Sequence, residues 1–215
     1  MISVNDPVGE AFHIKYYGGS NPHGSVLHRT SWMGVGLLKC PLDLWIYQEI
    51  MFEMKPDLII ETGTHNGGSA LFFSHLFDIL GKGEIITIDV NRPANPPQHP
   101  RITYITSSST DPNTVNRVRE RAAGKSSVMV VLDSDHTAPH VLNEMHAYHS
   151  LVTPRNYMIV EDTNINGHPA LPGWGPGPFE AIQAFMKQNQ DFEIDYGCEK
   201  LHLTMNPCGY LRKKG

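Results

Sequence analysis

Acidic side chains close four short apolar runs of this sequence, and their types and positions are those of a ligand site. The runs end at Glu61, at Asp89, at Asp133 and at the pair Glu161-Asp162. If the runs are parallel strands of one sheet, their carboxyl ends share an edge and the carboxylates converge on one crevice. A single acid after a strand is often only a helix cap or a turn former. Four acidic strand ends on one edge instead favour a binding site, with carboxylates for a cationic ligand, a ribose and a metal ion.

The glycine-rich segment after the first run has the pattern of a cofactor loop. It reads Glu61-Thr-Gly-Thr-His-Asn-Gly-Gly-Ser69 and leads from an apolar run into an amphipathic one. Such a strand-to-helix turn presents backbone N–H groups to a ligand. The spacing Glu-x-Gly-x-x-x-Gly differs from the dinucleotide pattern Gly-x-Gly-x-x-Gly. It fits better the loop that holds the methionine part of S-adenosylmethionine (SAM), whose ammonium and sulfonium suit an acidic strand end. The cofactor-binding residues predicted here are Glu61, Gly63, Thr64, His65, Gly67 and Ser69.

Asp89 ends the second predicted strand, where a carboxylate can accept both hydroxyl groups of a ribose. We therefore add it to the predicted cofactor site, with an Asx turn to Asn91 as the alternative. Ser107, Ser108 and Asp111 follow the third strand and are candidates for the adenine edge. Serines in loops usually face water, so only Ser108 is kept as a predicted contact.

Two acidic segments, Asp133-Ser-Asp135-His136 and Glu161-Asp162, predict a divalent metal site. Carboxylate oxygens are the ligands that Mg²⁺ and Mn²⁺ prefer, and burying so many acids without a cation would raise their pKa values. The expected ligands are Glu161, Asp162 and either Asp133 or Asp135, between which the sequence does not choose. Asp133 also counts as a candidate cofactor contact. His136 is the candidate general base, and its neighbour Asp135 counts with it as a candidate catalytic residue.

Three other features are weighed against simpler explanations. His136 and His140 have the i,i+4 spacing of a zinc site, but no cysteine is near them and surface histidines are common on helices. Lys39 is a candidate contact to the cofactor carboxylate or the substrate, with a solvent-facing lysine as the alternative. The Gly/Pro-rich segment 167–178 around Trp174 is interpreted as a lid or substrate wall, with an ordinary crossover loop as the alternative.

Composition favours one α/β domain that binds small molecules. The chain has 215 residues, 40% of them hydrophobic, and a formal net charge of −5, which disfavours a general nucleic-acid surface. No long uncharged apolar run predicts a membrane span, and no basic segment followed by an apolar one predicts a secretory signal. The three scattered cysteines show neither metal spacing nor a disulfide framework, so we expect a cytoplasmic protein.

Strands and helices are predicted to alternate after an irregular N-terminal arm, residues 1–31, that packs on the domain or on a neighbouring subunit. Strict alternation indicates a mainly parallel sheet with helices on both faces, formed by residues 32–215. An antiparallel final strand pair is expected by analogy with class I methyltransferases. The predicted strands are 58–60, 85–89, 102–106, 128–133, 157–161, 192–196 and 201–204, with a possible continuation at 210–211. The predicted helices are 42–54, 69–80, 111–123, 139–151 and 179–189.

Taken together, these segments resemble the cephalosporin hydroxylase family, a SAM-dependent methyltransferase group related to rhamnosyl O-methyltransferases. The resemblance extends from about Trp32 to Tyr210. It is carried by Trp32-Met-Gly34, Leu38-Lys39-Cys-Pro41-Leu-Asp43-Leu-Trp45-Ile-Tyr47-Gln48-Glu49, Ile60-Glu61-Thr-Gly63-Thr, Gly67-Gly68-Ser69-Ala70, Leu132-Asp133-Ser-Asp135-His136, Val160-Glu161-Asp162-Thr-Asn164 and Trp174-Gly-Pro-Gly-Pro178. The resemblance implies a Rossmann-like fold, SAM at the glycine loop, a divalent ion at the acids, and a homo-oligomer.

The function predicted from these features is a SAM- and Mg²⁺-dependent O-methyltransferase that acts on a hydroxyl group of a small polar metabolite, such as a sugar or an antibiotic intermediate. Neither a nucleic acid nor a membrane is an expected partner. The first alternative is a non-catalytic SAM-binding partner subunit of a hydroxylase or methoxylase system, which would not need the acids. The second is an NAD-dependent dehydrogenase, which the glycine spacing disfavours.

Overall fold

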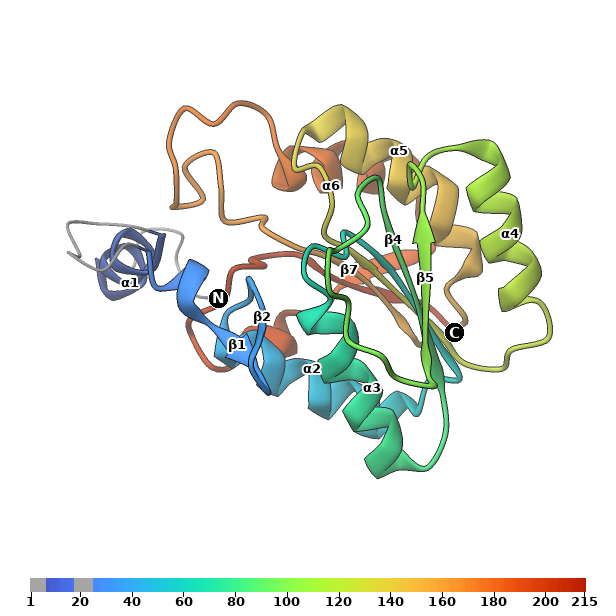
Figure 1. Cartoon of the computed structure of the whole chain (residues 1–215). Helices are drawn as coiled ribbons and strands as arrows, with labels where there is room; N and C mark the ends of the chain where they lie inside the picture. The colour runs from blue at the N-terminus through green and yellow to red at the C-terminus, as the bar shows by residue number, and fades with distance from the viewer. Residues whose placement is uncertain (1–6, 18–24) are drawn as a thin grey trace.

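The computed structural model describes residues 7–17 and 25–215, and within them seven strands form one sheet (Figure 1). The strand order is β5-β4-β3-β6-β7-β9-β8. Strands β3 to β7 are parallel, whereas β9 runs antiparallel to both β7 and β8. This confirms the predicted fold class. The strands are β3 (Leu58–Thr62), β4 (Glu84–Asp89), β5 (Ile102–Thr106), β6 (Val128–Leu132), β7 (Tyr157–Val160), β8 (Phe192–Ile194) and β9 (Tyr210–Lys213).

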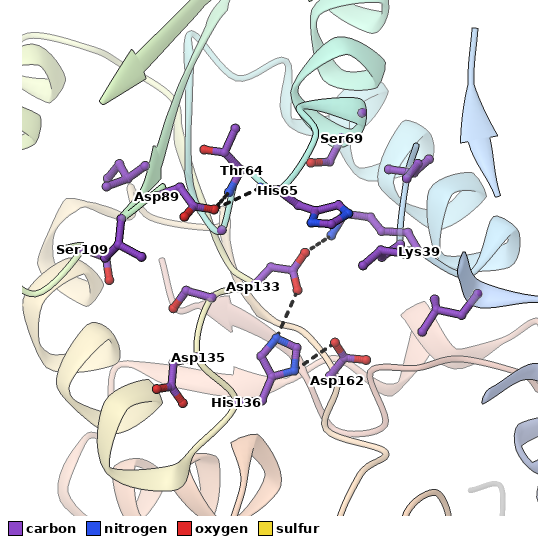
Figure 2. A pocket seen from close by; sticks show the side chains of 18 of the residues that line it. Lys39, Thr64, His65, Ser69, Asp89, Ser109, Asp133, Asp135, His136 and Asp162 are labelled. Atoms are coloured by element: carbon purple, nitrogen blue, oxygen red, sulfur yellow. Dashed lines mark hydrogen bonds and ion pairs between the residues drawn. The ribbon is translucent and has the colours of Figure 1, made fainter. Parts of the chain in front are cut away.

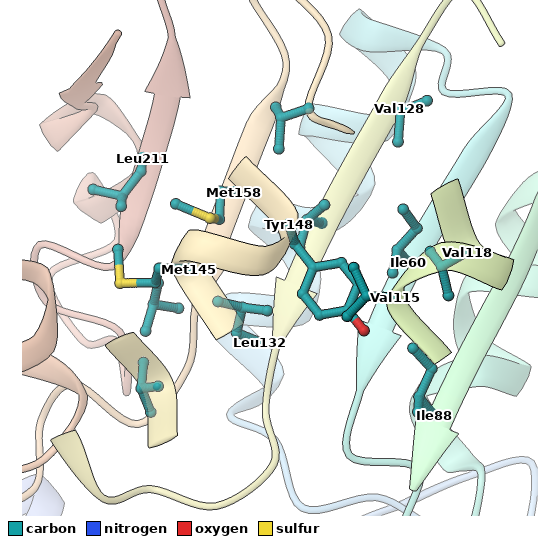
Figure 3. Close-up of a cluster of buried hydrophobic side chains, with 14 of the residues drawn as sticks. Ile60, Ile88, Val115, Val118, Val128, Leu132, Met145, Tyr148, Met158 and Leu211 are labelled. Carbon is teal, nitrogen blue, oxygen red and sulfur yellow. The ribbon is translucent and has the colours of Figure 1, made fainter. Parts of the chain in front are cut away.

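Helices cover both faces of the sheet because its strands are apolar on both sides. Successive side chains of a strand point to opposite faces, so Ile59 packs against α2 and α3, and Ile60 packs in the cluster formed with α4, α5 and α6 (Figure 3). No helix among the described residues is both long and apolar enough to cross a bilayer. The helices are α2 (Pro41–Met54), α3 (Gly68–Leu80), α4 (Pro112–Ala122), α5 (Ala138–Tyr148) and α6 (Pro178–Gln188).

The chain changes direction across the sheet between β3 and β6. From β3 it continues to β4 and β5 on one side, and it then crosses to β6 and β7 on the other. Ligands of open α/β sheets bind at such a switch point, beyond the carboxyl ends of the strands. Gly63 permits the two strand ends to approach, since a Cβ atom there would lie 1.7 Å from the backbone oxygen of Asp133.

The N-terminal arm contains regular structure that the sequence analysis did not predict. Residues Pro7–Tyr17 form helix α1, and a 3-10 turn (Leu27–Arg29) leads to a hairpin of β1 (Ser31–Trp32) and β2 (Val35–Gly36). The helix has no continuous apolar face, which is why its periodicity is weak, and it is held by individual side chains such as the buried His13 and Tyr16. The rest of the predicted arm, residues 1–6 and 18–24, lies outside the described residues.

The prediction of a strand at 201–204 is wrong. The strand that pairs antiparallel with β8 is β9. His202 has a left-handed backbone with φ of 68°, which interrupts an extended chain. The Thr204 hydroxyl and the Met205 backbone N–H both donate to the buried carboxylate of Asp43, at 2.5 and 2.9 Å. The segment therefore satisfies a buried acid of α2 and does not join the sheet.

Replacing Gly63 with alanine is expected to destabilise the protein by more than about 3 kcal/mol, because a methyl group meets the Asp133 backbone. Gly124→Ala is the matched control, since both glycines have positive φ (90° and 78°) but a Cβ at Gly124 meets nothing within 4 Å. The control should cost only about 1–2 kcal/mol for the left-handed backbone. Urea unfolding measures both, and equal losses would contradict the close approach at the switch point.

Acidification is expected to loosen helix α1. Burial lowers the pKa of His13 to about 4, and its Nδ1 accepts a hydrogen bond from the Asn164 side-chain amide at 3.0 Å. If Nδ1 were protonated, its N–H group would face the N–H group of the Asn164 amide, and the hydrogen bond would be lost. The folded pKa lies below the unfolded value of 6.5, so stability is complete above pH 6.5 and falls between pH 6.5 and 4, by up to about 3 kcal/mol. His13→Gln should flatten the pH dependence of unfolding in this window. A slope unchanged by that substitution would contradict the assignment.

Candidate active site

A cavity of about 750 Å³ lies at the carboxyl edge of the sheet. The loops that follow β3, β4, β5, β6 and β7 supply most of its walls, as the position of the switch point predicts (Figure 2). Of the residues proposed from the sequence, those that line it are Lys39, Gly63, Thr64, His65, Ser69, Asp89, Ser108, Asp133, Asp135, His136 and Asp162. Gly67, Glu61 and Glu161 do not line it.

Asp89 organises the glycine loop at one end of the cavity. Its Oδ2 accepts the backbone N–H groups of Thr64 at 2.9 Å and His65 at 3.0 Å, and its Oδ1 accepts that of Asn91 at 2.8 Å. The Asx turn considered for Asn91 is therefore present. These bonds use three of the roughly four acceptor positions of a carboxylate, which leaves about one for a ligand hydroxyl.

Glu61 lies behind the glycine loop, fully buried within β3. Its Oε2 accepts a hydrogen bond from the Thr87 hydroxyl at 2.6 Å, whereas its Oε1 is buried without a hydrogen-bond partner among the described residues. Burial raises the pKa of this carboxyl to about 7, although the positive charge of Lys39 acts in the opposite direction. An unsatisfied buried acceptor is costly, so a ligand donor that reached it would be stabilised.

Lys39 neutralises two acids at the floor of the cavity. It is only 2% exposed, and its Nζ lies 2.8 Å from Asp133 Oδ2 and 2.7 Å from Glu161 Oε1. Burial disfavours its charge, but the two carboxylates outweigh that effect and raise the pKa of the lysine. Glu161 is also bonded by the hydroxyl group of Tyr47 and is buried beneath the cavity surface, where burial raises its pKa to about 7. The lysine is therefore an internal counter-ion and does not face solvent.

Asp133, His136 and Asp162 form the cluster best suited to a metal ion. One donor atom from each lies within 4.8 Å of the others. His136 bridges the two acids, with its Nδ1 3.1 Å from Asp162 Oδ2 and its Nε2 3.5 Å from Asp133 Oδ1 (Figure 2). Burial disfavours the imidazolium, but both carboxylates outweigh it and raise the pKa of His136 well above its ordinary value. Asp162 is held with a left-handed backbone, φ 54°, which is uncommon outside glycine and is typical of functional sites.

Asp135 lines the cavity but does not join this cluster. Its Oδ1 accepts the backbone N–H of Thr137 at 2.9 Å, just before helix α5 begins, and this bond lowers the pKa of the carboxyl. Ser108 also lines the cavity, and its hydroxyl pairs with that of Thr110 at 3.1 Å. Asp111 is the N-cap of α4 and is not part of the cavity wall.

Another buried acid, which was not predicted from the sequence, lies near the cavity. Glu144 of α5 is fully buried, and its Oε1 accepts hydrogen bonds from the hydroxyl groups of Ser109 and Ser134, both of which line the cavity. His140 also approaches this oxygen, at 3.3 Å, so its role is to pair with Glu144 and not to bind zinc with His136. The sequence did contain a signal for this acid, because Glu144 lies among the buried residues of the predicted helix 139–151.

The segment between β7 and α6 covers part of the cavity, as predicted for a lid or substrate wall. Leu171 and Trp174 line the cavity, yet Trp174 is 54% exposed. The indole Nε1 donates to the backbone oxygen of His136 at 3.4 Å, which connects this wall to the acidic cluster.

Comparisons with known proteins agree with this geometry. The family model described as Rhamnosyl O-methyltransferase/CmcI matches residues 24–214. The rhamnosyl O-methyltransferase of Mycobacterium tuberculosis (strain ATCC 25618 / H37Rv) is 39% identical over 216 residues, which cover 96% of this chain and 85% of the relative. That of Mycobacterium leprae (strain TN) is 38% identical over 217 residues, covering 97% and 92%.

Solved structures share the fold. An apo structure of CmcI superposes with a TM-score of 0.69 at 24% identity, and a CmcI structure with Mg and SAM does so with 0.68 at 23%. Each alignment covers 92% of this chain and 82% of the other. MycE methyltransferase in complex with Mg, S-adenosylhomocysteine (SAH) and mycinamycin VI gives 0.57 at 17% identity, covering 79% and 48%. At these identities the likeness establishes the fold alone.

Replacing Lys39 with methionine is expected to cost about 3–5 kcal/mol of stability, because the buried carboxylate of Glu161 and the partly buried carboxylate of Asp133 lose their counter-ion. Lys82→Met is the matched control: its ion pair with Asp57, at 2.8 Å, is partly exposed to solvent. Such surface pairs contribute less than about 1 kcal/mol. Chemical unfolding at pH 7 compares the two variants. If both lose the same stability, Lys39 is not the counter-ion of the cluster.

Proposed function

We propose that this chain, which belongs to the Rhamnosyl O-methyltransferase/CmcI family, transfers a methyl group from SAM to a hydroxyl group of a sugar-containing small molecule. Membership confirms the family and the methyltransferase class predicted from the sequence. The two relatives compared above, from Mycobacterium tuberculosis and Mycobacterium leprae, are rhamnosyl O-methyltransferases, and they support a deoxysugar as the acceptor.

One observation carries the proposal: a single cavity joins the glycine loop to the acidic cluster. Thr64, Ser69 and Asp89 line one end, and Asp133 and Asp162 line the other. A methyl donor in the first part and an acceptor hydroxyl group beside the acids would lie next to each other. Bringing donor and acceptor together in this way accounts for much of the rate of a group transfer.

The residues present fit both SAM and a divalent ion. Asp89 keeps about one acceptor position for a ligand hydroxyl group beside the glycine loop, and the unpartnered Oε1 of Glu61 lies behind that loop. Asp133 and Asp162 offer carboxylate oxygens on the two sides of His136, and carboxylate oxygens suit Mg²⁺ or Mn²⁺. When bound, SAM supplies an electrophilic methyl group, and the ion supplies Lewis acidity that lowers the pKa of a hydroxyl group.

The chain's own residues prepare this site for proton transfer. Lys39 pairs with Asp133, and Tyr47 and Lys39 together hold Glu161 away from the cavity. Protonated His136 donates to both neighbouring acids, so it accepts a proton from an acceptor hydroxyl group only after releasing its own.

The alternatives receive less support. A non-catalytic SAM-binding partner subunit would not require a cluster of acids connected to the cofactor cavity, and the cluster is intact. An NAD-dependent dehydrogenase is disfavoured by both the glycine spacing and the family.

Two further expectations belong to the proposal. The described cysteines Cys40, Cys198 and Cys208 are all free thiols, which favours the cytoplasm. Trp45 and Phe52 expose large apolar side chains on α2, at 59% and 68%, which favours a homo-oligomer.

The activity is tested by incubating the protein with methyl-deuterated SAM and methyl α-L-rhamnoside, with Mg²⁺ or with a chelator, and measuring the labelled ether by mass spectrometry. Asp162→Asn should abolish the response to Mg²⁺. Asp135→Asn is the matched control, because this carboxylate only accepts a bond from Thr137, and it should retain the response. Loss in the control and retention in Asp162→Asn would place the ion elsewhere. If no label is transferred to methyl α-L-rhamnoside and calorimetry detects no SAH binding, the proposed function is refuted.

A further inference from the structure

We infer that the N-terminal helix α1 is part of the metal-binding end of the active site, and that Tyr17 is the positioning residue through which it acts. The inference rests on the proposed function, because it takes Asp162 as a ligand of the ion. It gives a role to a segment that the sequence alone describes only as an arm.

Tyr17 fixes the carboxylate of Asp162 from the side opposite to His136. The phenol donates to Asp162 Oδ1 at 2.7 Å, while Oδ2 faces His136 Nδ1 at 3.1 Å. Each oxygen of the carboxylate therefore has its own partner, and the plane of the group is defined. A carboxylate held at only one oxygen can rotate about its Cβ–Cγ bond. The hydrogen bond from Tyr17 to Oδ1 prevents this rotation, so it also restricts the direction in which Oδ2 points.

Asp162 depends on such outside contacts because its backbone does not favour its own position. Its φ of 54° is left-handed, and its backbone N–H donates to the side chain of Asn206 at 3.0 Å. Asp162 is thus tied on its backbone by the segment before β9 and on its side chain by α1. A strained residue of this kind persists only where its surroundings hold it.

Helix α1 is itself seated on the same loop by several buried contacts. The Tyr17 hydroxyl also lies 3.1 Å from Asn164 Oδ1, and the amide of Asn164 donates to His13 Nδ1 at 3.0 Å. The hydroxyl group of the preceding residue, Tyr16, donates to the backbone oxygen of Lys39 at 3.2 Å. The helix therefore bridges the loop after β7 and the segment before α2, which together carry both sides of the charged cluster.

Tyr17 also lines the cavity, so the same residue forms part of its wall and orients a candidate ligand. Hydrogen-bond partners outside a metal's ligands commonly change metal affinity by 10–100-fold when removed. Coupling of this kind is reciprocal: if a docked α1 strengthens metal binding, metal binding must equally stabilise the docked helix.

The first test measures Mn²⁺ binding by calorimetry, without SAM or acceptor, in the wild type, Tyr17→Phe and Tyr16→Phe. Tyr17→Phe keeps the ring and should weaken binding about tenfold. Tyr16→Phe is the matched control, because it removes a hydrogen bond of the same helix that touches no acid, and it should remain within about twofold. Unchanged affinity in Tyr17→Phe, or equal losses in both variants, would overturn the inference.

The second test follows the reciprocal effect by hydrogen exchange of the backbone amides of residues 7–17. Mn²⁺ should slow exchange in the wild type and in Tyr16→Phe, but have a smaller effect in Tyr17→Phe. If Mn²⁺ slows exchange equally in all three proteins, α1 does not act through Tyr17.

Asp162→Asn separates the two levels of the proposal. If the wild type binds Mn²⁺ no better than Asp162→Asn, the assignment of the ion to Asp162 fails and the inference fails with it. If Asp162→Asn loses binding while Tyr17→Phe keeps wild-type affinity, the proposed metal site stands and only the role of α1 is refuted.

Discussion

Three carboxylates lie buried or nearly buried at the carboxyl edge of the sheet, and the need to balance their charge explains much of the surrounding structure. Asp133, Glu161 and Asp162 cannot remain ionised in a protein interior without cations or donors nearby. Lys39 pairs with the first two, and His136 bridges the first and third. The molecule thus carries two positive side chains at the position where the proposed ion would add further charge.

This balance divides the acids into two roles. Glu161 is held by Lys39 and by Tyr47 beneath the cavity surface, so it contributes to the structure of the floor. Asp133 and Asp162 both line the cavity, and the imidazole of His136 bridges them. A ligand in the cavity can replace these imidazole contacts more readily than it can reach the buried Glu161. The division follows from geometry: two successive acids follow β7, and the left-handed backbone of the second, Asp162, turns the chain out of the strand direction.

The remaining walls come from segments that are distant in the sequence. Helix α1 brings Tyr17 to Asp162 across 145 positions, and the segment before α2 brings Lys39 to Glu161 across 122. The loop before α6 places Trp174 against the backbone of His136. An active site assembled in this way depends on the docking of peripheral segments as well as on the sheet, which locates its acids but leaves them open on one side.

Local patterns in the sequence were enough to predict the alternating strands and helices from α2 to β8, the edge of the sheet that carries the cavity, and the family. Those features depend on local patterns: apolar runs of strand length, glycines at a strand-to-helix turn, and acids at strand ends. The sequence did not reveal helix α1, because no continuous apolar face marks that helix, nor the absence of a strand at 201–204, because Thr204 instead satisfies the buried Asp43. Only the tertiary structure decided which acids face the cavity and that Lys39 is buried between two of them. Such pairings depend on side-chain directions and on contacts between residues more than ninety positions apart, which no local pattern encodes.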